Sequence, residues 1–314
     1  MDDKPLTLQL CPLAPHLEQL LRERTRCVSW FAMDHAQQTQ WLAEHASDTQ
    51  IVVTGGHLGC PSDLLTALPA LRLVAIHGVG FDRVDLTLAA ERKVRVTNTP
   101  DVLTEDVADL AIGLIIALKR ALPAADRFVR EGQWPTADMP LGRKVSGSKF
   151  GIVGLGRIGG AIADRLSAFG EIGYTARGDK ENDWRYFGDA EALAAWCDVL
   201  VVACVASPST SGLIDAGVLG ALGKNGCLIN VSRGSVVDEQ ALIDALDSGT
   251  IAGAALDVFA AEPNVPQALR SSERTVLAPH IGSGTVETRE AMGALMIANI
   301  DALLAGRELV TPLV

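Results

Sequence analysis

The sequence predicts an α/β protein with two parallel sheets, and three observations lead to this prediction. The chain has 314 residues, which is long for a single hydrophobic core and favours two domains. Short apolar runs alternate with amphipathic segments along most of its length, a pattern typical of parallel sheets covered by helices. A glycine-rich loop near residue 154 separates an apolar run from a helical pattern, which marks the start of a second α/β series.

The first series should form a small parallel sheet from five short apolar strands. They are expected at residues 6–10, 27–31, 51–54, 71–76 and 94–96. Asn98-Thr99-Pro100 then interrupts the pattern, and a long helix is expected over residues 104–120. Its start offers the hydroxyl of Thr104 as a cap and two acidic residues that suit a helix N-terminus.

The second series begins at Lys149 and should form a second parallel sheet. Its strands are expected at residues 149–153, 172–175, 199–203, 227–231, 252–256 and 275–277. Helices are expected over residues 157–169 and over the closing stretch 286–304, where apolar residues recur at helical spacing.

Composition and charge exclude several classes of protein. With 27 basic against 38 acidic residues, the net charge of −11 disfavours nucleic acid and anionic membranes as partners. The apolar stretch 110–118 is about half of the ~18 residues that a membrane span needs. The six cysteines lack CxxC spacing, so we expect reduced thiols, a cytoplasmic location and no metal site.

The loop Gly154-Leu155-Gly156-Arg157-Ile158-Gly159 predicts a Rossmann-type dinucleotide-binding domain, because it links an apolar strand directly to a helix. Gly154 permits the tight turn, Gly156 lets the backbone approach a pyrophosphate, and Gly159 allows close packing of helix on strand. The helix N-terminus then offers N–H groups to the phosphates. The alternative is a glycine-rich turn that binds no ligand.

The end of the next strand bears on the choice of cofactor. An NAD site usually places an acid there to bind the ribose hydroxyls, but Ala176 and Arg177 occupy that place. A guanidinium suits the additional 2′-phosphate of NADP, so the sequence favours NADPH over NADH. The alternative is that Arg177 is a solvated side chain and that Asp179 binds the ribose.

Six stretches together resemble the D-isomer-specific 2-hydroxyacid dehydrogenases over nearly the whole chain, and above all the NADPH-dependent glyoxylate/hydroxypyruvate reductases of that family. They lie at residues 77–82, 154–159, 174–177, 229–234, 255–259 and 279–283. The resemblance implies a Rossmann-type NAD(P)-binding domain over residues 99–284. It also implies a smaller flavodoxin-like substrate (lid) domain, formed by residues 1–98 together with 285–314.

The resemblance also implies three catalytic residues. Arg233 would bind the substrate carboxylate, a task that suits a planar group with a permanent charge. His280 would donate the proton to the carbonyl oxygen as hydride reaches the carbon. Glu262 would pair with His280, because a carboxylate beside an imidazole favours its charged form. The alternatives are that Arg233 is a surface arginine, that His280 has a structural role and that Glu262 caps a loop.

Further positions follow from the same resemblance. Asp257 would contact the nicotinamide carboxamide, Val79 and Gly80 would present backbone N–H groups to the substrate, and Ser283 would add a hydroxyl. With Asp257, the expected cofactor-binding residues are Thr104, Gly154, Gly156, Arg157, Ile158, Gly159, Ala176, Arg177, Val205, Ser207, Thr210 and Val231.

The sequence therefore predicts NADPH-dependent reduction of small 2-oxo acids, glyoxylate and hydroxypyruvate, to glycolate and D-glycerate. One alternative is a reductase of larger aromatic 2-oxo acids such as hydroxyphenylpyruvate, with the loop around residues 134–141 helping to set the choice. Another is a non-catalytic NAD(P)-binding regulator. A homodimer is expected, because the helix over residues 106–118 is too apolar to face water and, in the resembling family, packs against its twofold mate.

Overall fold

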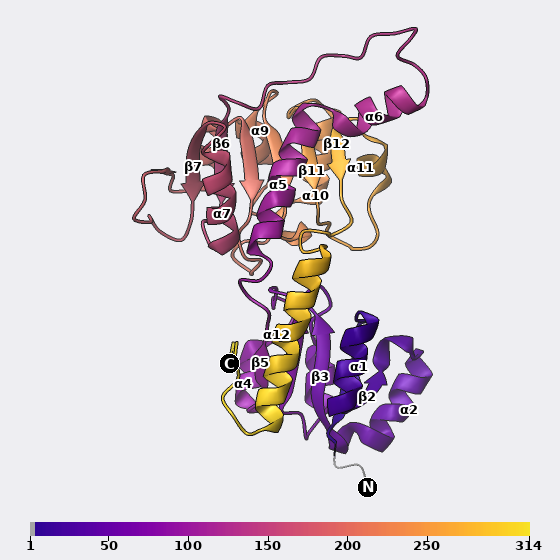
Figure 1. Ribbon diagram of the computed structural model, residues 1–314. Coiled ribbons are helices and arrows are strands. Elements are labelled where there is room, and N and C mark those ends of the chain that lie inside the picture. Colours follow the sequence, from indigo (N-terminus) through magenta and orange to yellow (C-terminus); the bar gives the residue numbers. More distant parts are fainter. Residues whose placement is uncertain (1–3) are drawn as a thin grey trace. The chain divides into compact units, whose positions relative to one another are not determined.

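The computed structural model describes residues 4–314, which divide into two compact units (Figure 1). The first contains the described residues up to Leu103 together with Val286–Val314, and the second contains Thr104–Thr285. Each unit has its own parallel sheet, so the predicted α/β class with two sheets is confirmed.

The first unit contains a five-stranded parallel sheet in the order β2-β1-β3-β4-β5. This is the strand order of flavodoxin-like folds. The five strands predicted for this part of the chain are all present, with ends that shift by at most two residues. They are β1 (Leu6–Gln9), β2 (Arg26–Ser29), β3 (Thr49–Gly55), β4 (Leu73–His77) and β5 (Arg95–Thr97).

Short helices connect these strands, and the C-terminal helix completes the unit. In chain order they are α1 (Pro15–Arg24), η1 (Trp30–Ala32), α2 (His35–His45), η2 (Ala46–Asp48), α3 (Ser62–Ala67), α4 (Leu86–Glu91) and α12 (Val286–Leu304). α12 runs along the sheet (Figure 1) and buries Met296 and Ile300 in one cluster with Ile51 and Leu73. The chain therefore returns to its first sheet at the end.

A buried asparagine fixes the chain terminus to this unit. The side chain of Asn299 is fully buried on α12 and accepts hydrogen bonds from the N–H groups of Val310 (2.9 Å) and Thr311 (3.0 Å). The hydroxyl of Thr311 in turn donates to the carbonyl of Asn98 at 2.6 Å. Because the buried polar groups bind one another, the segment after α12 is held against the end of β5.

The second unit contains a seven-stranded parallel sheet in the order β12-β11-β10-β9-β6-β7-β8. Six of these strands were predicted: β6 (Lys149–Val153), β7 (Glu171–Thr175), β9 (Val199–Val202), β10 (Cys227–Asn230), β11 (Gly253–Leu256) and β12 (Thr275–Leu277). β8 (Arg185–Tyr186) has only two residues, too short for an apolar pattern to predict it. The order is that of a Rossmann-type sheet with an added seventh strand.

Helices cover both faces of this sheet. They are α5 (Thr104–Lys119), α6 (Leu122–Arg130), α7 (Arg157–Leu166), α8 (Ala190–Trp196), α9 (Ala216–Leu222), η3 (Gly234–Val236), α10 (Glu239–Asp247) and α11 (Gln267–Ser271). α5 and α7 pack side by side, and Arg165 of α7 binds the carboxylates of Glu105 (2.6 Å) and Asp109 (2.7 Å) on α5. α8, α9 and α10 form the other layer.

α5 buries part of its apolar surface against its own chain, so this helix by itself does not decide between a monomer and a dimer. Its buried side chains include Val107, Leu114 and Ile115, and the helix packs on α7 and on β10, β11 and β12. The sheet and α7 thus bury one side of α5, while Leu110, Ile112 and Ile116 are only half-buried, so the dimer expected from this helix stays a prediction.

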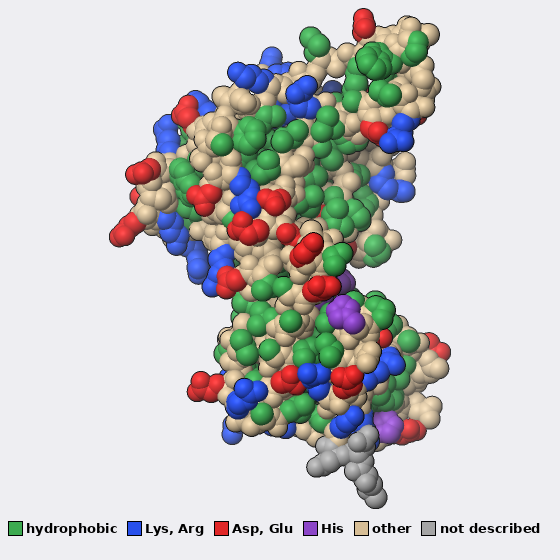
Figure 2. Space-filling model, in the orientation of Figure 1, with side chains coloured by type: hydrophobic (Ala, Val, Ile, Leu, Met, Phe, Trp, Pro, Cys, Tyr) green, Lys and Arg blue, Asp and Glu red, His purple; other side chains and the backbone are tan. Residues whose placement is uncertain are grey.

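Apolar side chains are exposed instead on α6 and the loop after it, which we call the exposed arm (residues 122–141). Leu122, Val129, Trp134 and Leu141 expose 48%, 54%, 68% and 99% of their surface. The arm extends away from the body of the second unit (Figure 1), and hydrophobic side chains gather over it in Figure 2. Exposed apolar clusters of this kind mark interaction surfaces.

All six cysteines are free thiols. Burial raises the pKa of Cys60 and Cys197 to about 12, so both stay protonated at neutral pH. Within residues 4–314, no helix is long and apolar enough to cross a membrane. The described residues also contain no group of three or more His, Cys, Asp or Glu side chains that could hold a metal ion.

Candidate functional site

The glycine loop after β6 has a geometry that only glycine permits. Gly154 has a φ of +95°, and a Cβ there would lie 2.5 Å from the Cα of Cys204. At Gly159 a Cβ would lie 2.0 Å from the carbonyl oxygen of Gly154. Glycine at these two positions therefore lets the loop pack against β9 and lets α7 begin close to β6.

The same loop leaves room for a phosphate group. A Cβ at Gly156 would meet no atom within 4 Å. Gly156 is the N-cap of α7, and no side chain caps the helix there. The first N–H groups of α7, beginning with Arg157 and Ile158, therefore lie at an uncapped helix N-terminus, which favours anions. These features fit the pyrophosphate of a dinucleotide.

The loop lies at the topological switch point of the sheet. β6 and β9 are neighbours, but the chain proceeds from β6 to β7 on one side and from β9 to β10 on the other. Ligands of doubly wound sheets bind in the crevice that this reversal creates. The loop after β9 holds Val205, Ser207 and Thr210 in a closed turn. The Thr210 hydroxyl donates to the Val205 carbonyl (2.9 Å) and accepts from the Ser207 N–H (2.8 Å).

The predicted determinants of cofactor choice lie beside this crevice. β7 ends at Thr175, whose carbonyl accepts the N–H of Gly154 at 2.8 Å, so Ala176 and Arg177 begin next to the glycine loop. Arg177 is exposed. Asp179, the alternative ribose ligand, is bound to the hydroxyl of Tyr174 at 2.5 Å.

The structure shows the surroundings of two further predicted cofactor residues, Val231 and Thr104. Val231 is buried after β10, and its N–H donates to the carbonyl of Val202 at the end of β9. Thr104 is the first residue of α5, next to Glu105, which binds Arg165 of α7. Val231 thus lies next to the end of β9, and Thr104 begins the helix that packs against α7.

The three predicted catalytic residues follow three neighbouring strands. Arg233 comes after β10, Glu262 after β11 and His280 after β12. Because these strands are parallel and adjacent, the residues that follow them share one edge of the sheet. The structure brings two of them into direct contact, with Nδ1 of His280 lying 2.7 Å from Oε2 of Glu262.

Glu262 is fixed from both sides and is charged at neutral pH. Its Oε1 accepts the N–H of Phe259 at 3.0 Å, while its Oε2 binds His280. Burial pushes the pKa of Glu262 upward, but the hydrogen bonds from His280 and Phe259 and the charges of His280 and Arg233 outweigh it. The pKa of Glu262 therefore lies below its ordinary value of 4.5.

Arg233 is held near this pair by the packing of two loops. A Cβ at Gly234 would lie 2.0 Å from the carbonyl carbon of Phe259, so the turn after β10 rests directly on the turn after β11. Arg233 Nη1 donates to the carbonyl of Ser232 at 2.8 Å, and the hydroxyl of Ser232 donates to the carbonyl of Cys204 at 2.6 Å. These contacts link the turn that carries Arg233 to the turn beside the glycine loop.

Asp257 positions the turn that carries His280. Its two carboxylate oxygens accept the N–H groups of Ile281 (2.7 Å) and Gly282 (2.8 Å), and its carbonyl accepts the N–H of His280 (2.9 Å). Burial raises the pKa of Asp257, and these two amide bonds oppose the rise. The contact of Asp257 with a nicotinamide stays a prediction, as does the contact of Ser283, the next residue of the same turn, with a substrate.

Val79 and Gly80 belong to the first unit and follow β4. Their turn is fixed by the side chain of Asn98, which donates to the Val79 carbonyl at 2.8 Å. Gly78 and Thr99 add two bonds, from the Gly78 N–H to the Thr99 hydroxyl (3.1 Å) and from the Thr99 N–H to the Gly78 carbonyl (2.9 Å). The backbone is ordered there, while its role toward a substrate stays a prediction.

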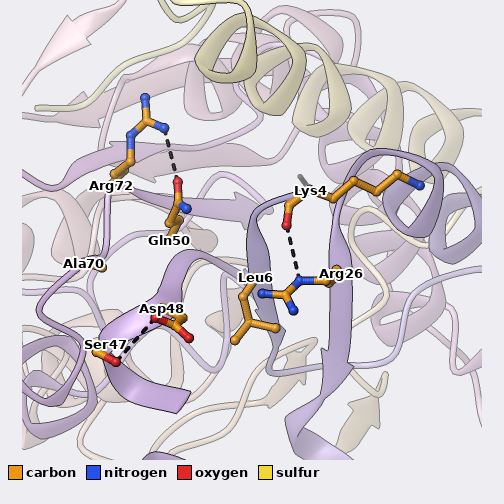
Figure 3. Close-up of a pocket in the computed structure, with 8 residues that line it drawn as sticks. All are labelled: Lys4, Leu6, Arg26, Ser47, Asp48, Gln50, Ala70 and Arg72. Atoms are coloured by element: carbon orange, nitrogen blue, oxygen red, sulfur yellow. Dashed lines mark hydrogen bonds between the residues drawn. The ribbon is translucent and has the colours of Figure 1, made fainter. Parts of the chain in front are cut away.

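A surface depression of about 510 Å³ also lies in the first unit, where none of the predicted site residues line it (Figure 3). Its polar groups largely bind one another: Arg26 donates to the carbonyl of Lys4 (3.3 Å) and Arg72 to the side chain of Gln50 (3.3 Å). Asp48 also lines the depression. The depression is not part of the candidate site.

Comparison with known proteins agrees with this geometry. The family model for the NAD-binding domain of D-isomer-specific 2-hydroxyacid dehydrogenases matches residues 112–282. The chain is 46% identical over 309 residues to hydroxyphenylpyruvate reductase of Plectranthus scutellarioides, and equally to glyoxylate/hydroxypyruvate reductase A of Arabidopsis thaliana. In both comparisons 98% of each chain is covered.

A solved structure is similar throughout. It is the NADPH-dependent glyoxylate/hydroxypyruvate reductase of Sinorhizobium meliloti in complex with NADP and malonate. The TM-score is 0.91 at 41% identity, and the comparison covers 99% of this chain and 97% of that one. With the glycine loop, the switch-point crevice and the His280–Glu262 pair in place, the chain belongs to the D-isomer-specific 2-hydroxyacid dehydrogenases, a family of nicotinamide-dependent oxidoreductases.

Proposed function

We propose that the protein is an NADPH-dependent reductase of small 2-oxo acids, converting glyoxylate and hydroxypyruvate to glycolate and D-glycerate. The observation that carries the proposal is the His280–Glu262 pair, with Oε2 of Glu262 2.7 Å from the ring and the charge of Arg233 close enough to lower the Glu262 pKa. The names of the Arabidopsis and Sinorhizobium relatives support the choice of substrates.

Arg233, His280 and Glu262 have separate roles in the reduction. A bound nicotinamide would supply the hydride. Arg233 binds the substrate carboxylate and polarises the oxo group, because a guanidinium offers a planar pair of donors. With Nδ1 bound to Glu262, Nε2 of His280 is the nitrogen that we assign to proton transfer, and its charge stabilises the developing alkoxide. Glu262 keeps the imidazole oriented.

In the first unit, we propose that the N–H groups of Val79 and Gly80 bind the substrate carboxylate. In the second, we propose that Asp257 contacts the nicotinamide carboxamide and that the hydroxyl of Ser283 contacts the substrate. These roles rest on the family to which the chain belongs. We also propose a cytoplasmic location, which the six free thiols support.

The alternative substrate is a larger aromatic 2-oxo acid, and the similarity to the Plectranthus hydroxyphenylpyruvate reductase favours it. A steady-state panel of glyoxylate, hydroxypyruvate and hydroxyphenylpyruvate, each with NADPH and NADH, tests the proposal. A higher kcat/KM for the two small acids supports it, and a higher kcat/KM for hydroxyphenylpyruvate favours the alternative.

Removal of the proton donor should affect chemistry rather than cofactor binding. His280→Ala should lower kcat by roughly 10²-fold or more, because it removes both proton transfer and stabilisation of the oxyanion. The Kd of NADPH, measured by its fluorescence, should stay unchanged. His16→Ala, at an exposed histidine of the first unit, is the matched control. A kcat near wild type in His280→Ala would rule out the assigned role.

The pH profile tests the function of Glu262. Since the pKa of Glu262 lies below 4.5, this carboxylate is charged across pH 5 to 9 and favours the imidazolium over that whole range. Glutamine can still accept the N–H of Phe259 but carries no charge. In Glu262→Gln the neutral amide no longer favours the imidazolium, so the alkaline limb of the kcat profile for reduction should move to lower pH.

Glu239→Gln is the control for this profile, because Glu239 accepts the nearby N–H of Ala260 without contacting His280. Its profile should match that of the wild type. A Glu262→Gln profile that coincides with the wild type from pH 5 to pH 9 would show that the carboxylate does not control the protonation of His280.

The choice of cofactor should depend on Arg177. Arg177→Ala should raise the KM for NADPH by about 10- to 150-fold, equivalent to the ~1.5–3 kcal/mol of charge-assisted hydrogen bonds to a phosphate. The KM for NADH should change little. Arg307→Ala removes one positive charge from the first unit and controls for net charge. Equal increases for NADPH and NADH would contradict the role of Arg177.

We propose that the protein is a homodimer and that the exposed arm forms its interface, because the arm presents four largely exposed apolar side chains. Light scattering at micromolar concentration should give twice the chain mass of 33.1 kDa. Val129→Asp should shift the mass toward the monomer. Val310→Asp places the same charge on an exposed valine of the first unit and should leave the mass unchanged. A monomeric wild type would refute the dimer.

A further inference from the structure

The loop after β7 is closed by a single buried hydroxyl. Tyr174 is fully buried, and its ring contacts that of Tyr186 on β8 with a centroid separation of 5.5 Å. Its hydroxyl donates to Oδ1 of Asp179 at 2.5 Å and accepts the N–H of Lys180 at 2.7 Å. Residues 175–180 therefore fold back onto the strand from which they come.

This closure determines which side chain the loop after β7 exposes. Because residues 179 and 180 are tied to residue 174, Arg177 lies at the middle of the turn, and its side chain is exposed. The turn starts beside the glycine loop, since the Thr175 carbonyl accepts the Gly154 N–H at 2.8 Å. The fold thus presents a guanidinium where an NAD-specific site presents an acid.

The same closure restrains the carboxylate that would favour NADH. Asp179 is the first acid after β7, and one of its oxygens is occupied by the phenol. A free carboxylate in this loop would bind the ribose diol of NADH and repel the 2′-phosphate of NADPH. The phenol therefore acts on the cofactor only through Asp179 and the shape of the turn.

We propose that Tyr174 and Asp179 form a latch that determines cofactor selectivity, by withdrawing the carboxylate from the ribose and presenting Arg177 to the 2′-phosphate. The inference rests on the proposed use of NADPH. It assigns Tyr174 a positioning role, and that role differs from core packing because it depends on the hydroxyl rather than on the ring.

Tyr174→Phe keeps the buried ring and removes the hydroxyl. The readout is the ratio of the Kd values for NADPH and NADH, measured by nucleotide fluorescence without any 2-oxo acid. A matching pair is 2′,5′-ADP and 5′-AMP, used as competitors. Selectivity for the 2′-phosphate should fall by about 3- to 10-fold, the range expected when one hydrogen bond is lost. NADPH should bind more weakly and NADH more tightly.

Two further variants separate the latch from general loosening. Tyr186→Phe removes the hydroxyl of the tyrosine whose ring contacts Tyr174 and should leave the selectivity unchanged. Tyr174→Phe combined with Asp179→Asn removes the charge that the first change releases, so it should restore much of the selectivity. Thermal melting of each variant reports whether the fold is intact.

The outcomes of these measurements test the latch and the proposed cofactor separately. If the wild type prefers NADPH and Tyr174→Phe has wild-type selectivity, the latch is refuted while the proposed cofactor stands. Equal losses in Tyr174→Phe and Tyr186→Phe also refute it. If the wild type shows no preference for NADPH but Tyr174→Phe still shifts binding toward NADH, the latch stands while the proposed cofactor fails.

Discussion

The edge of the second sheet that carries the predicted catalytic residues depends on the hydrogen bonds of Asp257. Its carboxylate and carbonyl together bind three consecutive N–H groups, those of His280, Ile281 and Gly282. His280 has a φ of +54°, a left-handed conformation that costs a non-glycine residue about 1–3 kcal/mol and persists only where its surroundings enforce it. Asp257 supplies this constraint, and the imidazole of His280 contacts Glu262.

The strand order of the sheet explains why residues far apart in sequence form one site. β10, β11 and β12 are neighbours, so the turns that carry Arg233, Glu262 and His280 follow one another along one edge. The contact of Gly234 with the Phe259 backbone and the bond from Ser232 to the Cys204 carbonyl extend this edge to the switch point. The chemical groups and the glycine loop are thus parts of one rigid framework.

Much of this arrangement could be predicted from sequence, because apolar strands and the glycine loop have strong local patterns. The pairing of Glu262 with His280 followed from family resemblance, and the structure brings the two side chains to 2.7 Å. The roles of Asp257 toward backbone N–H groups and of Tyr174 toward Asp179 were missed. A tyrosine in an apolar strand looks like a core residue, and an aspartate after a strand looks like a turn residue.

The covering of α5 was missed for a related reason. Its composition showed an apolar helix, but only the packing of α7 and of β10 to β12 could show that its own chain buries one side of it. Four of the exposed apolar residues lie on α6 and its loop, where Leu122, Val129, Trp134 and Leu141 are spread over twenty residues. That spread has no single period in the sequence, because the segment is part helix and part loop.

A chain with a net charge of −11 has to bind anions at this site, and the local chemistry explains how it can. The acids around the site already have partners: Glu262 binds His280, Asp257 binds two backbone N–H groups, and Asp179 binds Tyr174. Each hydrogen bond draws a carboxylate toward a donor of the protein and weakens its repulsion of a ligand. Arg177, Arg233 and the uncapped N-terminus of α7 are positive groups of the site, so the binding of anionic ligands would depend on how the acids are held rather than on an excess of basic residues.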